Sequence, residues 1–331
     1  MRHDLRFRPP RPDDVQAVTE LLNACSMADI GVPDTTAEEV LSSWHRPNRD
    51  VDRDVILAEL DGQIAGYVEL DAMPPWTGIR IDGYVHPAFA DRGIGSALLD
   101  RGKRRAEALS RRAPPDETIV IYHGAWHGTA AAAFLRHRGW EPARTFWRMR
   151  IEMDGPPPSL AWPGGIVVRA ASIPEDEVPL HAAMEEAFAD HWDHRPVPFD
   201  RWIHDYRTHP GYDPTLWFVA WEGREIAGAV ICRRFTSDEP DCAWIDDVGV
   251  RPPWRRRGVA MALLLHGFHE LYRRGIRKAA LMVDAGSAVG APALYDRAGM
   301  IVHRRIDVFR KVLISRNART ATKRAQVTPT A

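Results

Sequence analysis

Three consecutive arginines and a glycine, Arg255, Arg256, Arg257 and Gly258, stand at the expected start of a helix, where they could bind an anion. The apolar segment before them stops at Pro252-Pro253, because proline cannot continue a strand ladder. The first N–H groups of a helix have no partner within it, and glycine lets a ligand approach the backbone. Several charge-assisted hydrogen bonds of about 1.5–3 kcal/mol each could hold a pyrophosphate. The sequence therefore predicts a phosphate-binding loop between a strand and a helix.

The spacing Arg255-x-x-Gly258-x-Ala260 resembles the signature of the GNAT acyltransferases, which is Arg or Gln, two residues, Gly, one residue, then Gly or Ala. In that family the loop wraps the pyrophosphate of acetyl-CoA, so the resemblance implies acetyl-CoA as co-substrate. It also implies an α/β (α+β) fold, a mixed and mostly antiparallel sheet flanked by helices. The coenzyme-binding residues that it implies are Val248, Gly249, Val250, Arg255, Arg256, Arg257, Gly258, Val259 and Ala260.

The same order of strand, proline, basic loop and helix start occurs roughly 165 residues earlier in the chain. Two further pairs of segments match in the same order, 54–66 with 217–228 and 134–140 with 294–300. These ordered matches predict two tandem copies of one GNAT fold. The loop of the first copy gives a second set of candidate coenzyme-binding residues: Val85, Arg92, Gly93, Ile94, Gly95 and Ser96.

A segment rich in proline and glycine separates the two copies. We expect an N-terminal domain at 1–154, this linker at 155–165 and a C-terminal domain at 166–314. Residues 315–331 are polar and basic without apolar periodicity, which predicts a disordered tail. In the first copy, hydrophobic patterns predict strands at 5–8, 119–122 and 144–153, a hairpin at 54–73, and helices starting near 13, 36, 96 and 129.

The resemblance places the chemistry in the second copy. Tyr295 stands four residues before Gly299, where GNAT enzymes have a tyrosine beside the coenzyme sulfur. In the first copy Leu135 replaces that tyrosine and Ala90 replaces the signature Arg or Gln. We therefore expect the first copy to support the second, either by binding a coenzyme A moiety or by keeping the shape.

Acetyl transfer to an amine needs a proton acceptor, because an amine with a pKa of about 10.4 is almost entirely charged at pH 7. Asp246 and Asp247 precede Val248 on the predicted strand and are the base candidates. Strand alternation puts one of them on the face shared with Val248, and parity favours Asp246 unless a bulge intervenes. The position where the family often has a glutamate holds Trp244, and a solvated acidic pair is the alternative interpretation. A bulge would also expose backbone N–H groups that polarise the thioester carbonyl.

Three further features bear on substrate binding. Ser287 takes the position where many relatives have Asn, so its hydroxyl could bond a pantetheine amide or cap a helix. The segment from Phe188 to His209 is rich in histidine and tryptophan and takes the place that usually sets acceptor specificity. Its spacing fits no HExxH or cysteine-assisted metal site, so aromatic lining is favoured over metal. The stretch 123–127 in the first copy, also rich in histidine, could line a second pocket or only pack.

The amino-acid composition limits the classes of protein to which this chain can belong. Among 331 residues, 44 basic and 45 acidic side chains give a net charge of −1, which argues against a nucleic-acid binder. Three cysteines without a CxxC pair, no signal core and no long apolar run predict a cytoplasmic protein without a membrane partner. The leading hypothesis is an acetyl-CoA-dependent N-acetyltransferase of a small-molecule amine. The alternatives are a member of the mycothiol synthase family, which also has tandem GNAT copies, and a non-catalytic acyl-CoA sensor.

Overall fold

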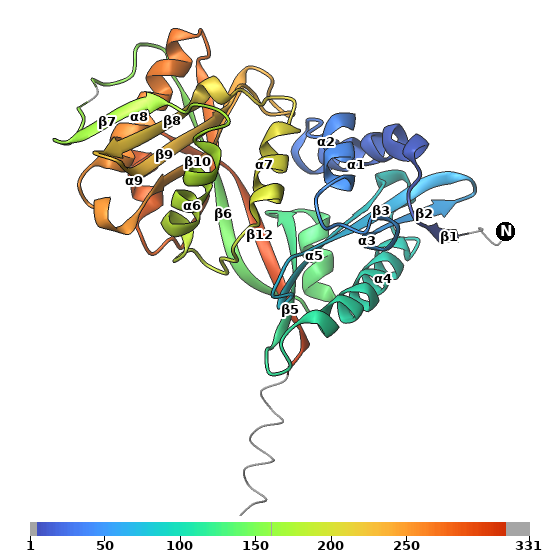
Figure 1. Ribbon diagram of the computed structural model, residues 1–331. Helices are drawn as coiled ribbons and strands as arrows, with labels where there is room; N and C mark the ends of the chain where they lie inside the picture. Colours follow the sequence, from blue (N-terminus) through green and yellow to red (C-terminus); the bar gives the residue numbers. More distant parts are fainter. Residues whose placement is uncertain (1–4, 160, 316–331) are drawn as a thin grey trace, which may run out of the picture. The chain divides into compact units, whose positions relative to one another are not determined.

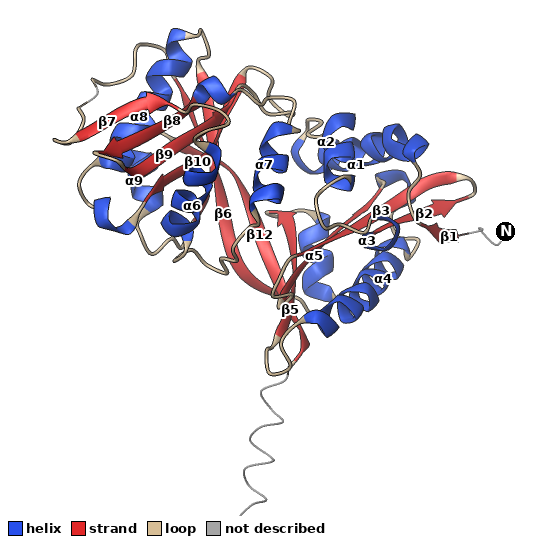
Figure 2. Ribbon diagram, viewed as in Figure 1, coloured by secondary structure: helices blue, strands red, loops and turns tan. Residues whose placement is uncertain are grey.

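The chain forms two compact units in the computed structural model, which describes residues 5–159 and 161–315 (Figure 1). Of these, the first unit contains 5–33, 48–143 and 307–315, and the second contains 34–47 and 144–306. Apart from Ser315, the predicted tail at 315–331 lies outside the described residues. The α/β fold class expected from the sequence is confirmed, since each unit is a mixed sheet flanked by helices (Figure 2).

The strand order of the first unit is β1-β2-β3-β4-β5-β12. The first three pairs are antiparallel, and β4 and β5 are parallel. Helices α1 and α4 pack on β3 and β4. The elements are β1 Leu5–Arg8, α1 Val15–Ile30, α3 Val51–Asp54, β2 Val55–Leu60, β3 Gln63–Ala72, β4 Gly78–Val85, α4 Ile94–Leu109, β5 Ile119–Trp126 and α5 Ala130–His137.

The second unit has the strand order β12-β6-β11-β10-β9-β8-β7. Successive residues of β9 alternate between two apolar cores. Val230 joins the core with α8, whereas Ile231 joins the core with α6 and α7, so the helices cover both faces of the sheet. The elements are α2 Ala37–Trp44, β6 Glu141–Glu152, β7 Ile166–Ala170, α6 Glu177–Phe188, α7 Phe199–Arg207, β8 Trp217–Glu222, β9 Glu225–Arg233, β10 Cys242–Val250, α8 Val259–Arg273, β11 Lys278–Asp284, α9 Ala291–Arg297 and β12 Ile301–Ile314.

The compact units differ from the two sequence copies because the closing strands are exchanged. Strand β6 closes the first copy in sequence, yet it pairs antiparallel with β11 of the second unit from Phe146 to Glu152. The last half of β12 lies in the first unit, where Phe309 is fully buried in its core. The segment 34–47, with α2, also belongs to the second unit. Sequence similarity alone could not show these exchanges, because an exchanged strand keeps the apolar pattern of its copy.

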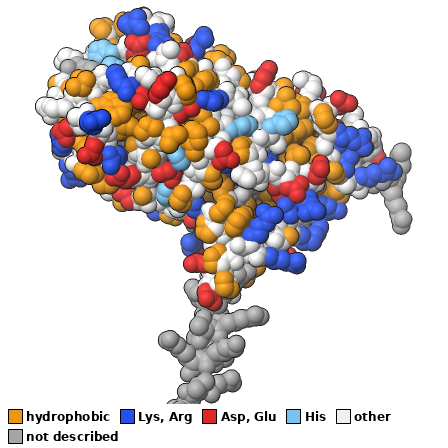
Figure 3. Space-filling model, viewed as in Figure 1, with side chains coloured by type: hydrophobic (Ala, Val, Ile, Leu, Met, Phe, Trp, Pro, Cys, Tyr) orange, Lys and Arg blue, Asp and Glu red, His pale blue; other side chains and the backbone are white. Residues whose placement is uncertain are grey.

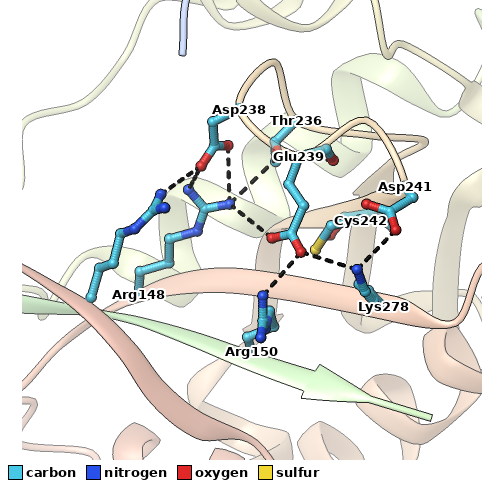
Figure 4. Close-up of polar contacts among 10 residues, drawn as sticks. Arg148, Arg150, Thr236, Asp238, Glu239, Asp241, Cys242 and Lys278 are labelled. Atoms are coloured by element: carbon cyan, nitrogen blue, oxygen red, sulfur yellow. Dashed lines mark hydrogen bonds and ion pairs between the residues drawn. The ribbon is translucent and has the colours of Figure 1, made fainter. Parts of the chain in front are cut away.

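A charged network fastens β6 within the second unit (Figure 4). Arg148, only 5% exposed, bonds both carboxylate oxygens of Asp238 in the loop before β10. Arg150 donates to Glu239 at 3.0 Å, and Lys278 on β11 reaches Asp241 at 2.8 Å. A buried arginine needs this pairing, since an unpaired charge in the interior is strongly destabilising. The network therefore ties the exchanged strand to the segment that leads into β10.

Basic and acidic side chains are mixed over the face that Figure 3 shows, except over α4, where Lys and Arg side chains gather. That helix carries Arg101, Lys103, Arg104 and Arg105. Within residues 5–159 and 161–315, no helix is both long and apolar enough to cross a membrane.

Candidate active site in the second unit

Strand β10 contains a bulge at Asp246. Its pairing with β9 runs from Trp244 to Ile245, skips Asp246 and resumes with Asp247 opposite Ile231. Its parallel pairing with β11 ends at Ile245 and Leu281, although both strands continue. The two strands therefore no longer pair beyond this point, and the bulge changes how the side chains alternate.

Backbone N–H groups of β10 point into the space left between the strands. Arg251 donates its N–H to Ala227 on β9 at 3.0 Å, and N–H directions alternate along a strand. The N–H groups of Val248 and Val250 consequently point away from β9, toward β11. Both residues line a cavity of about 1560 Å³ in the second unit. These N–H groups can hold the amide of an extended ligand or polarise a carbonyl oxygen.

The loop that the sequence predicts to bind phosphate lines the same cavity. Gly258 is the N-cap of α8 with φ of 86°, a left-handed conformation in which glycine has no Cβ penalty. Arg256 also has a positive φ, 63°, so two residues of the loop have left-handed backbone just before the helix begins. Loop and helix residues that line the cavity are Arg255, Arg256, Gly258, Val259 and Ala260.

Two of the three loop arginines have structural partners. Arg255 bonds Asp190 and donates to the carbonyl of Ala187 at 2.9 Å, so it ties the loop to the end of α6. Arg257 pairs with Glu222 on β8 and is absent from the residues that line the cavity. The signature arginine, Arg255, thus orders the loop and also lines the cavity beside Arg256.

Tyr295 of α9 lines the same cavity and is 7% exposed. Burial and the nearby Asp247 carboxylate raise the pKa of Tyr295 well above its usual value. The phenol therefore keeps its proton at neutral pH and can donate a hydrogen bond or a proton to a thiolate.

The bulge brings both carboxylates into the cavity. Asp246 accepts from Arg233 at 2.8 and 2.7 Å, and Asp247 accepts a hydrogen bond from the hydroxyl of Tyr206 on α7. In a regular strand the side chains of Asp246 and Asp247 would lie on opposite faces of the sheet. The sequence left open whether a bulge intervenes, and the bulge in the structure lets both side chains line the cavity. Burial, reinforced by Asp247, raises the pKa of Asp246 to about 7 despite Arg233. Such a group is poised to accept a proton at neutral pH.

Ser287 lines the cavity but does not cap a helix. Helix α9 begins at Ala291 with Gly290 as its N-cap, so the helix-cap interpretation of Ser287 is wrong. Its N–H instead donates to the carbonyl of Asp284 at 3.1 Å in a turn after β11.

The lining of the cavity includes residues that sequence reasoning missed. Helix α2, which belongs to the first copy in sequence, contributes Glu39, Ser42 and Ser43, and the segment just after it contributes Arg46. Glu39 pairs with His209 at 3.0 Å and Arg46 pairs with Asp205 at 2.9 Å, both on or next to α7. No sequence pattern within the second copy could reveal that these residues of the first copy line the cavity. Tyr206 and Arg233 were also missed, since their role depends on facing the bulge.

The aromatic lining expected from the segment Phe188 to His209 is present. Phe188, His191, Trp192, His194, Trp202 and His209 all line the cavity. His194 pairs with Glu185 at 3.2 Å. Among the described residues, no group of three His, Cys, Asp or Glu side chains is arranged to hold a metal ion.

The loop of the first unit has the same backbone but a different surrounding. Gly93 is the N-cap of α4 with φ of 76°. Ser96 lines a smaller cavity of about 440 Å³ with residues of α4 and α5. Val85, Arg92, Gly93, Ile94 and Gly95 line neither this cavity nor the larger one.

The model of the Acetyltransferase (GNAT) family matches residues 15–139 and 179–300 of this chain. A mycothiol acetyltransferase of Geodermatophilus obscurus is 30% identical over 300 residues, which are 88% of this chain and 92% of that protein. A mycothiol acetyltransferase of Nocardia farcinica is 30% identical over 282 residues, 82% of this chain and 86% of that one.

Solved structures agree with these matches. A GCN5-related N-acetyltransferase from Sphaerobacter thermophilus is 35% identical and has a TM-score of 0.76, covering 93% of this chain and 96% of its own. A tandem GNAT protein from the clavulanic acid biosynthesis pathway has a TM-score of 0.68 at 16% identity, covering 94% and 99%, which shows a common fold.

Proposed function

Because the chain belongs to the GNAT family of acetyltransferases, we propose that it transfers the acetyl group of acetyl-CoA to a small-molecule amine and that the second unit carries the chemistry. One observation carries this proposal. A single cavity in the second unit joins the phosphate-binding loop, the unpaired edge of β10, the two carboxylates and Tyr295.

The residues of this cavity can divide the reaction among them. The N–H groups before α8 and Arg256 would hold the pyrophosphate, and Ser287 and the edge of β10 would hold the extended pantetheine arm. The N–H of Val248 or Val250 would polarise the thioester carbonyl. Acetyl-CoA supplies the activated acetyl group.

The proton balance follows from the carboxylates and the tyrosine. The amine nitrogen forms the new C–N bond as the C–S bond breaks, and the pair Asp246 and Asp247 accepts the proton that the nitrogen loses. Tyr295 protonates the departing sulfur. Deprotonating a lysine-like amine at pH 7 costs about 4–5 kcal/mol, so a nearby base with a pKa of about 7 is useful.

A direct test incubates the purified chain with acetyl-CoA and a panel of amines and follows the release of the coenzyme thiol. Turnover with at least one amine, together with calorimetric binding of acetyl-CoA, is the expected result. Binding of acetyl-CoA without turnover of any amine would contradict the proposed chemistry.

A second candidate is the reaction after which the relatives are named, acetylation of the mycothiol precursor. It is favoured by 30% identity over 88% of the chain. One residue opposes it, because Trp244 stands where that family has a catalytic glutamate, with Arg148 over its ring at 5.3 Å. The panel should therefore include the desacetyl thiol precursor; a kcat/KM far above that of simple amines would select this candidate.

A further inference from the structure

The first unit has its own pair of parallel strands with an opening between them, but a side chain spans that opening. Pairing of β4 with β5 ends at Arg80 and Tyr122, as pairing of β10 with β11 ends in the second unit. The next residue on β5 is His123, which is 6% exposed. The residue after the last pair on β11 is Met282, which lines the large cavity.

His123 accepts a hydrogen bond from the backbone N–H of Gly83, a group that a bound coenzyme would need. Gly83 on β4 donates its N–H to His123 Nε2 at 3.2 Å. Pairing with the preceding strand makes Gly83 the counterpart of Val248, since they face Val68 and Val230 respectively. The N–H that points into the cavity in the second unit is therefore bonded to an imidazole in the first.

The imidazole is fixed in this position by its other contacts. Its Nδ1 lies 2.7 Å from the carbonyl of Gly124, which can only accept, so Nδ1 carries the proton and Nε2 is the acceptor. The ring of Trp140, 3% exposed, packs edge-on against it with centroids 6.3 Å apart. Both ring nitrogens are thus satisfied in a packed interior, and displacing the ring would leave buried polar groups unpaired.

The charge of the first loop also disfavours a pyrophosphate. At the position of Arg256 the first loop has Asp91, with the same left-handed backbone, φ of 59° against 63°. Asp91 and Arg92 sum to no net charge, whereas the second loop has three consecutive arginines. An acidic side chain at an anion site repels the ligand.

From these contacts we infer that His123 closes the coenzyme site of the first unit, so that each chain binds a single coenzyme A, in the second unit. This inference rests on the proposed function, because it assumes that the second unit binds the coenzyme. The first copy contributes structure instead, namely strand β6 and helix α2 of the second unit.

Calorimetric titration of the full-length protein with coenzyme A tests the inference through the binding ratio. The wild type is expected to bind one equivalent. Ala260→Glu, which puts a carboxylate at the start of α8, should abolish binding. The matched change Gly95→Glu, at the start of α4, should leave one equivalent; the Cβ at that position meets only ordinary contacts, 3.5 Å from Val85. Binding of two equivalents by the wild type, or a reduced ratio in Gly95→Glu, would overturn the inference.

Because Asp91 also opposes a pyrophosphate, His123→Ala is combined with Asp91→Arg, which puts at this position the residue that the second loop has there. The double variant should raise the ratio from one to two, Asp91→Arg alone should leave it at one, and adding Gly95→Glu to the double variant should return it to one. A folded double variant that still binds one equivalent, or two equivalents bound by Asp91→Arg alone, would show that His123 does not close the site. If the double variant fails to fold, the comparison of Ala260→Glu with Gly95→Glu still decides the stoichiometry. Absence of any binding by the wild type would instead refute the proposed function.

Discussion

Strands β4 and β10 hold equivalent places in the two units, and they differ by one extra residue. Pairing of β4 with β3 is continuous from Ile79 to Val85, whereas β10 has the bulge at Asp246. Without a bulge, Gly83 meets an imidazole; with it, two carboxylates and two N–H groups line a cavity. Two residues therefore distinguish the two units here. The inserted Asp246 marks the candidate catalytic copy, and His123 fills the opening between the parallel strands in the other copy.

The largest expected effect comes from removing the carboxylates that the bulge exposes. The double variant Asp246→Asn, Asp247→Asn should lower kcat about 1000-fold, the range of general base catalysis. Calorimetric binding of acetyl-CoA should persist, because neither residue belongs to the loop. Asp82→Asn, at the equivalent position on β4, is the matched control and should leave kcat unchanged. Comparable losses in both units would break the comparison.

Support of the bulged strand can be tested at the buried network in Figure 4. Asp238→Ala leaves Arg148 and Arg304 without their shared carboxylate, and should lower the free energy of unfolding by about 3 kcal/mol. Asp241→Asn, in an exposed pair with Lys278, should cost less than about 1 kcal/mol. Urea denaturation measures both. Equal small losses would mean that the network does not hold β6 and the loop before β10.

Tyr295→Phe removes the hydroxyl and keeps the ring, and should lower kcat about 100-fold with an unchanged KM for acetyl-CoA. Leu135→Met at the matching position of α5 should change neither constant, because Leu135 is a core residue at 1% exposure. A faster turnover with better leaving thiols in Tyr295→Phe would confirm that the phenol protonates sulfur. Steady-state kinetics with both variants provides the readout.

The pH profile gives the smallest effect. Burial raises the pKa of Asp246 to about 7, so kcat/KM should fall about tenfold per pH unit below that value. In Asp246→Asn the inflection near pH 7 should disappear while the ionisation of the amine remains. An unchanged inflection in the variant would assign it to another group.

The raised pKa of Asp246 also makes the free energy of unfolding depend on pH, in the direction opposite to the activity. The folded chain retains a proton that the unfolded chain releases, so this stabilisation is present at low pH and is lost as pH rises through about 7.

Much of the fold was predictable because its signals are local. The hairpin at 54–73 and the matching segment 217–228 were predictable from strand patterns around a turn with an acidic residue and glycine. The structure has strands on both sides of each turn, and Asp61, Gly62 and Gly223 have positive φ. The N-terminal residues of α2 form the predicted helix start, with Thr36 and Glu39 in a capping box. The exchange of β6 and β12 was not predictable, because either neighbour could satisfy the same strand pattern.

The candidate site divides in the same way. The amino-acid sequence determined the candidate coenzyme loop, because a glycine at a helix start and the arginines beside it form a pattern within a few residues of chain. It also determined the duplication and the position of Tyr295. Only the tertiary structure decided that the carboxylates share a cavity, that Arg257 turns to Glu222 and that α2 lines the second unit. The bulge at Asp246, the place of α2 in the second unit and the position of His123 all depend on contacts between distant residues. Such contacts leave no local pattern in the sequence.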